Sequence, residues 1–177
     1  MAEFLFAYGT MLHNPLDEQA QIAMDRYTQR VDYGWVLGRL YDFGDYPGAV
    51  PPGWKRGRRV QEDDDEQTQE ADDDGQQEDE GEDEEEAPSG RVHGQILRII
   101  DSRRFFRVMD EYEELDFQMP HSGEFRREKV DAHPRSRPSR PIECWIYWVN
   151  RVGSSAPVIA SGDWVEYVTK RRRRRRR

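Results

Sequence analysis

Apolar residues at helical spacing predict one amphipathic helix near the middle of the chain. The residues that would share its buried face are Phe105, Phe106, Met109 and Tyr112. We expect the helix to begin at Ser102, a residue type that caps helix N-termini. Asp110 and Glu113 stand three residues apart beside this face, so both carboxylates should point the same way.

These two carboxylates have two interpretations. A carboxylate at the lip of an apolar pocket is poorly solvated, which raises its pKa toward neutral pH and suits it to act as a general base. An isolated D-x-x-E pattern is more often part of a solvated acidic face. The helix alone does not decide between the two interpretations.

Short runs of apolar, aromatic and β-branched residues predict the strands. They lie at 4–8, 31–43, 92–100, 125–130 and 142–149. Gly34 and Gly38 interrupt the second run, so we expect bends or bulges there. Strands outnumber helices, which predicts an α+β domain built on a curved or barrel-like sheet.

Weaker patterns mark the connecting segments. Residues 16–27 predict a short second helix with Ile22, Ala23 and Met24 facing inward. Residues 41–48 are rich in turn residues and carry three aromatic side chains. We expect a loop there, of the kind that lines a pocket. Gly9 and Thr10 end the first strand, either as a plain turn or as a place where backbone N–H groups meet a ligand.

Charge is concentrated in two appendages. Residues 61–87 hold 17 of the 36 acidic residues and no basic one, while Lys170–Arg177 are all basic. The rest of the chain carries equal numbers of acidic and basic residues, so the net charge of −9 belongs to the appendages. The acidic run lacks aromatic and branched apolar residues and cannot offset its ordering entropy. We therefore predict one domain over 1–169, a disordered acidic insertion at 52–90 and a flexible basic tail at 170–177.

Several classes of site have no support in the sequence. There is no dinucleotide-binding or P-loop motif, and the four histidines are scattered, so we expect no metal and no cofactor. The single Cys144 excludes an internal disulfide and suits a packed thiol in a strand.

Location and charged partners follow from the same composition. The start has no basic, apolar leader and no run approaches the roughly 20 apolar residues of a membrane span, so we expect a soluble cytoplasmic protein. Nucleic acid should make only weak contact with Lys170–Arg177, because the acidic run competes for the same cations. The oligomeric state is left open.

Seven short motifs stand in a characteristic order. They are Phe6-Ala7-Tyr8-Gly9-Thr10-Met11, then Gly38-Arg39-Leu40-Tyr41-Asp42 with Gly44 and Tyr46-Pro47-Gly48, then Val92-His93-Gly94-Gln95-Ile96, Met109-Asp110-Glu111-Tyr112-Glu113, Phe125-Arg126-Arg127, Trp145-Ile146-Tyr147 and Ser161-Gly162-Asp163-Trp164. In this order they resemble the gamma-glutamylcyclotransferase-like family. The resemblance covers residues 4–51 and 90–168.

The resemblance implies a fold, a site and a reaction. The family's fold is a small mixed-sheet barrel with flanking helices and one pocket. Glu113 matches the family's catalytic glutamate, and Glu114 stands where the family often has glycine. The residues that would hold the amino-acid end of the substrate are Tyr8, Gly9, Thr10 and Met11. Family enzymes cyclise a gamma-glutamyl group to 5-oxoproline and release an amine or amino acid, without metal or cofactor.

Three functions remain open at this point. The first is such an enzyme, acting on a small gamma-glutamyl amine or peptide through Glu113. The second is a binding protein that keeps the pocket without turnover. The third is an interaction protein that acts through its charged appendages.

Overall fold

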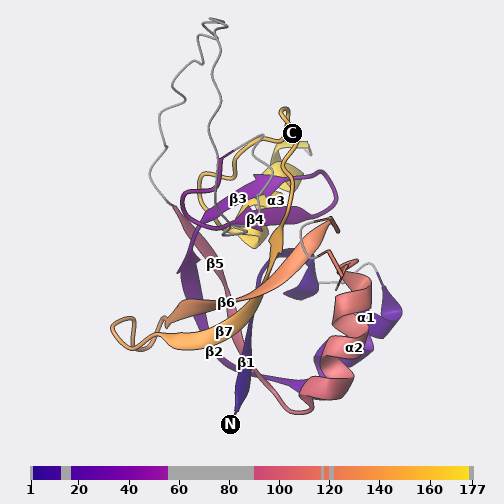
Figure 1. Cartoon of the computed structure of the whole chain (residues 1–177). Coiled ribbons are helices and arrows are strands. Elements are labelled where there is room, and N and C mark those ends of the chain that lie inside the picture. Colours follow the sequence, from indigo (N-terminus) through magenta and orange to yellow (C-terminus); the bar gives the residue numbers. More distant parts are fainter. Residues whose placement is uncertain (1, 13–16, 56–89, 117, 120–121, 176–177) are drawn as a thin grey trace, which may run out of the picture.

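Five strands close into a barrel in the computed structural model, which describes residues 2–12, 17–55, 90–116, 118–119 and 122–175. In barrel order the strands are β1 (Glu3–Ala7), β5 (Arg91–Ile99), β2 (Thr28–Leu37), β6 (Phe125–Pro134) and β7 (Ile142–Val149) (Figure 1). Neighbouring strands are antiparallel except β1 and β7, which pair in parallel and close the barrel. The predicted α+β fold with a small mixed-sheet barrel is confirmed.

The alternation of side chains along the strands separates two cores. Phe6 of β1 and Ile146 of β7 belong to a cluster to which all five strands contribute, so these residues fill the barrel. Their neighbours Leu5, Ala7 and Tyr147 belong to the second cluster, on the outer face. Successive side chains of a strand point to opposite faces, and here both faces are buried. The strands therefore appear in the sequence as continuous apolar runs.

Helices α1 (Glu18–Tyr27) and α2 (Ser102–Tyr112) lie side by side and cover that outer face (Figure 1). The expected start of α2 is confirmed, but its N-cap is Asp101, whose side chain accepts from the N–H of Arg104. In α1, Ala23 and Met24 are buried as predicted. Ile22 is 44% exposed and was wrongly expected to face inward, and Ala20 is buried in its place.

Glycines shape the middle of the chain differently from expectation. The predicted strand 31–43 breaks at Gly38 into β2 and β3 (Arg39–Asp42), and β3 forms a hairpin with β4 (Pro47–Val50). The predicted loop at 41–48 is therefore mostly hairpin. The register shift of β2 lies between Arg30 and Asp32 rather than at Gly34. A short 3-10 helix, η1 (Gly9–Leu12), follows β1.

The C-terminal part corrects the predicted tail. Helix α3 (Trp164–Arg175) includes most of the basic run, so the expectation of a flexible tail is wrong as far as Arg175. Of the disordered insertion predicted at 52–90, residues 56–89 lie outside the described residues. No helix within the described ranges is long and apolar enough to cross a membrane.

Candidate active site

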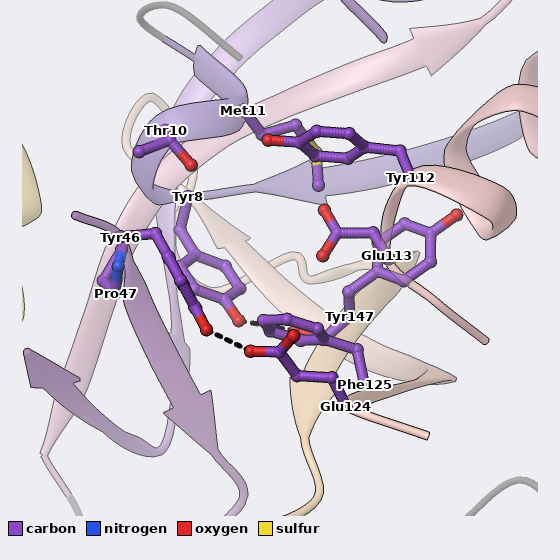
Figure 2. A pocket seen from close by; sticks show the side chains of 10 residues that line it. All are labelled: Tyr8, Thr10, Met11, Tyr46, Pro47, Tyr112, Glu113, Glu124, Phe125 and Tyr147. Carbon is purple, nitrogen blue, oxygen red and sulfur yellow. Dashed lines mark hydrogen bonds between the residues drawn. The ribbon is translucent and has the colours of Figure 1, made fainter. Parts of the chain in front are cut away.

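A cavity of about 150 Å³ opens where η1, the end of α2 and the β3–β4 hairpin meet strands β6 and β7. Ten side chains line it, most of them aromatic or acidic (Figure 2). They are Tyr8, Thr10, Met11, Tyr46, Pro47, Tyr112, Glu113, Glu124, Phe125 and Tyr147. No lysine, arginine or histidine is among these ten, so the cavity carries negative charge when its carboxylates ionise.

The structure brings most of the predicted site residues together. Tyr8, Thr10 and Met11 line the same cavity as Glu113, although about a hundred residues separate them in sequence. Gly9 does not line it. Its φ is +72°, and a Cβ there would lie 2.4 Å from the ring of Pro47, so glycine lets β1 turn closely into η1.

The end of α2 holds Glu113 in place. Glu113 is the C-cap, and the next two residues form a Schellman motif. The N–H of Leu115 donates to the carbonyl of Asp110 at 2.9 Å, and the N–H of Glu114 donates to the carbonyl of Glu111 at 3.1 Å. Glu114 has φ +51°, a conformation that favours glycine, which explains why glycine suits this position.

The carboxylate of Glu113 is buried and unpaired. The residue is 8% exposed, and its side chain faces into the cavity (Figure 2). Within the described part of the chain, no hydrogen bond or ion pair reaches this carboxylate. Burial first, and then the charges of Glu124 and Asp110, raise its pKa to about 8. The pocket interpretation of Glu113 therefore replaces that of a solvated acidic face.

Asp110 and Glu113 were expected to point the same way, but the carboxylate of Asp110 is held by partners on β6 and β7. This carboxylate accepts two hydrogen bonds from Arg127 Nη1, at 2.5 and 2.6 Å, and one from the hydroxyl of Tyr147 at 2.8 Å. The guanidinium of Arg127 also lies 3.8 Å from the ring centre of Phe106. Asp110 thus ties α2 to β6 and β7, whereas no such contact with a described residue holds the carboxylate of Glu113.

Tyr8 contributes a fixed wall of the cavity. Its hydroxyl donates to the carbonyl of Tyr147 at 2.6 Å and accepts from the N–H of Ala49 at 3.2 Å. Burial raises the pKa of Tyr8 far above its ordinary value, so the ring stays neutral. Tyr8 therefore joins β1, β4 and β7 at the base of the site.

Six of the ten lining residues were not among the predicted site residues, namely Tyr46, Pro47, Tyr112, Glu124, Phe125 and Tyr147. Tyr46 belongs to the aromatic segment that was expected to line a pocket, and its hydroxyl donates to Glu124. Glu124 follows a loop and stands in no motif, and Tyr147 stands in the Trp145-Ile146-Tyr147 motif, where it is one of several aromatics in a strand.

Comparisons with known proteins support the family resemblance. Residues 83–166, which include Glu113, match the model of the family described as gamma-glutamyl cyclotransferase, AIG2-like. The crystal structure of an uncharacterized protein from Pyrococcus horikoshii is similar over 97% of both chains, with a TM-score of 0.54 and 13% identity, which shows the fold alone. No curated protein matches the chain. The resemblance predicted from the seven motifs is confirmed.

Proposed function

We propose that this chain, a member of the gamma-glutamylcyclotransferase-like family, cyclises the gamma-glutamyl group of a small amine or peptide to 5-oxoproline. The observation that carries the proposal is the buried, unpaired carboxylate of Glu113, whose pKa of about 8 lies near working pH. A base with such a pKa can both accept a proton and return it within one turnover.

The reaction needs one proton acceptor and one curled substrate. The α-amine of the glutamyl group attacks its own γ-carbonyl, so one C–N bond forms while the bond to the leaving amine breaks. Glu113 takes the proton from the attacking nitrogen and delivers it to the leaving nitrogen. Atoms balance without water or a co-reactant. Because the attack is intramolecular, holding the substrate curled supplies much of the rate.

The walls of the cavity suit that substrate. The amino-acid end would lie against Tyr8, Thr10 and Met11, beside the start of η1, while Gly9 keeps the backbone close. The first N–H groups of η1 have no partner within the 3-10 helix and are suited to a carboxylate or a developing oxyanion. The aromatic rings of Tyr112, Phe125 and Tyr147 would exclude water from the reacting atoms.

A substrate panel tests the proposal. Purified protein is incubated with gamma-glutamyl amines and gamma-glutamyl dipeptides, and 5-oxoproline and the released amine are both measured. The matched control is the α-glutamyl isomer of each compound, in which the amine is bonded to the α-carbonyl, so ring closure of the α-amine on the γ-carbon cannot release it. We expect equal amounts of both products from gamma isomers only.

The other outcomes separate the alternatives. Binding of a gamma-glutamyl compound without turnover would replace the enzyme with a binding protein of the same fold. If the protein neither binds nor turns over any compound of the panel, the assignment of the cavity to gamma-glutamyl compounds is refuted.

A further inference from the structure

Three arginines in the last turn of α3 form no ion pair with any residue that the structure describes. Arg172, Arg173 and Arg174 are exposed, and no carboxylate of the described residues pairs with them. Lys170 and Arg171, by contrast, each form an ion pair with a carboxylate of the fold. The fold therefore neutralises the first two cations of the basic run and presents the next three to solvent. We call these three residues the arginine end of α3.

The helix that carries them is fixed to the barrel domain. The side chain of Asp42 is buried and accepts from the hydroxyl of Tyr167 at 2.7 Å and from Arg171 at 3.1 Å. The ring of Trp164 is buried in the barrel cluster. These contacts hold α3 at both its first and its third turn, so the arginine end is a preformed element rather than a loose tail.

The arrangement of the three charges fits a groove. Successive residues of an α-helix lie about 100° apart around its axis, so three consecutive arginines point to different sides. A helix is about 10–12 Å wide, and the major groove of B-form DNA is about 12 Å wide with phosphates along both edges. We propose that the arginine end of α3 binds duplex DNA through its phosphates, without preference for base sequence.

The composition of this helix end favours DNA over a membrane surface. Residues 169–175 include no apolar side chain. A helix that lies on a membrane needs an apolar face to bury in the lipid, so this end would contact lipid headgroups by charge alone. Duplex DNA offers a charge about every 1.7 Å of its axis, which gives three guanidinium groups closely spaced partners.

Binding of a fluorescent 20-base-pair duplex to the full chain tests the proposal. The test variant replaces Arg172, Arg173 and Arg174 with glutamine. The control replaces three exposed arginines of the β6–β7 turn instead, and so changes the net charge equally; these are Arg135, Arg137 and Arg140. Fluorescence anisotropy gives the dissociation constant at 50 and 200 mM salt, and thermal melting shows that each variant is folded.

With three phosphate contacts, wild-type affinity should fall about 40-fold between 50 and 200 mM salt. The test variant should bind at least about tenfold more weakly at 50 mM and lose most of this salt dependence, while the control stays within about twofold of wild type. Equal weakening in both variants, or no binding by wild type at 50 mM salt, would overturn the proposal.

Two further measurements test the helix and the partner. Thr169→Pro keeps every charge but interrupts α3 before the arginine end, so it should weaken DNA binding. Wild-type affinity in this variant would show that a fixed helix is not required and would contradict the proposal. Tighter binding to phosphatidylserine vesicles than to the duplex would also refute it, in favour of a membrane surface.

Discussion

Glu113→Gln should stabilise the protein relative to wild type, by an amount that grows as pH rises. Glutamine keeps the shape of the side chain but cannot ionise. The pKa of Glu113 is raised to about 8 in the fold, against 4.5 for an ordinary glutamate. The fold therefore disfavours the charged form. The stability contributed by the protonated carboxyl is complete below about pH 4.5 and is lost as pH rises through 8.

The size of this loss follows from the shift in pKa. Each unit corresponds to about 1.4 kcal/mol, so the loss approaches about 5 kcal/mol above pH 9. At pH 7 it is about 3 kcal/mol, and at pH 4 it is close to zero. These are upper limits, because water that enters the cavity solvates the carboxylate. Glu113→Gln avoids the whole loss.

Urea unfolding between pH 4 and 9.5 measures the effect. The free energy of unfolding of Glu113→Gln should exceed that of wild type by an amount that grows with pH. Glu111→Gln serves as the control, because Glu111 is exposed two residues earlier on the same helix. Its difference from wild type should stay small and constant. Parallel curves for Glu113→Gln and wild type between pH 5 and 9 would refute the raised pKa and the tuned base with it.

Three further changes test the turn at Gly9, the C-cap region at Glu114 and the acidic run at 61–87. Gly9→Ala should cost about 2–4 kcal/mol and raise KM, whereas Gly53→Ala, with a similar φ but open space around it, should cost only about 1 kcal/mol; equal melting temperatures would refute the close approach. Glu114→Gly should stabilise the C-cap by about 1 kcal/mol at unchanged activity, whereas Glu111→Gly should destabilise α2 by a similar amount. If urea unfolding shows Glu111→Gly to be more stable than Glu114→Gly, this explanation of the C-cap is refuted. Deleting residues 61–87 should strengthen salt-sensitive DNA binding, and unchanged affinity at low salt would show that the acidic run does not compete.

Most of the fold could be predicted from periodic patterns of apolar residues. The strands β5 and β7 and the helix α2 were visible because burial on a defined face leaves a period of two or 3.6 in the sequence. Gly38 was expected to bend a single strand, and it divides that strand into β2 and β3 instead. Gly34 was misjudged because its role, a close approach to the carbonyl of His133, depends on a strand about a hundred residues away.

The site was less predictable than the fold. Asp110 and Glu113 both stand beside the apolar helix face, and the family resemblance singled out Glu113. The pairing of Asp110 with Arg127 could not be predicted, because a D-x-x-E pattern looks the same whether one carboxylate or both remain free. The basic run was expected to be a flexible tail because charge runs are usually solvated. The sequence gives no sign that Arg171 pairs with the buried Asp42, because the two residues are distant in the chain.

The central claim is that Glu113 moves the proton in gamma-glutamyl cyclisation. The most direct test compares 5-oxoproline formation by wild type, Glu113→Gln and Glu111→Gln on the best substrate of the panel at pH 8. The account predicts that kcat falls by about 10²–10⁴ in Glu113→Gln alone, because an amide cannot accept the proton, while substrate binding survives. Glu113→Gln with more than a tenth of the wild-type kcat would contradict it.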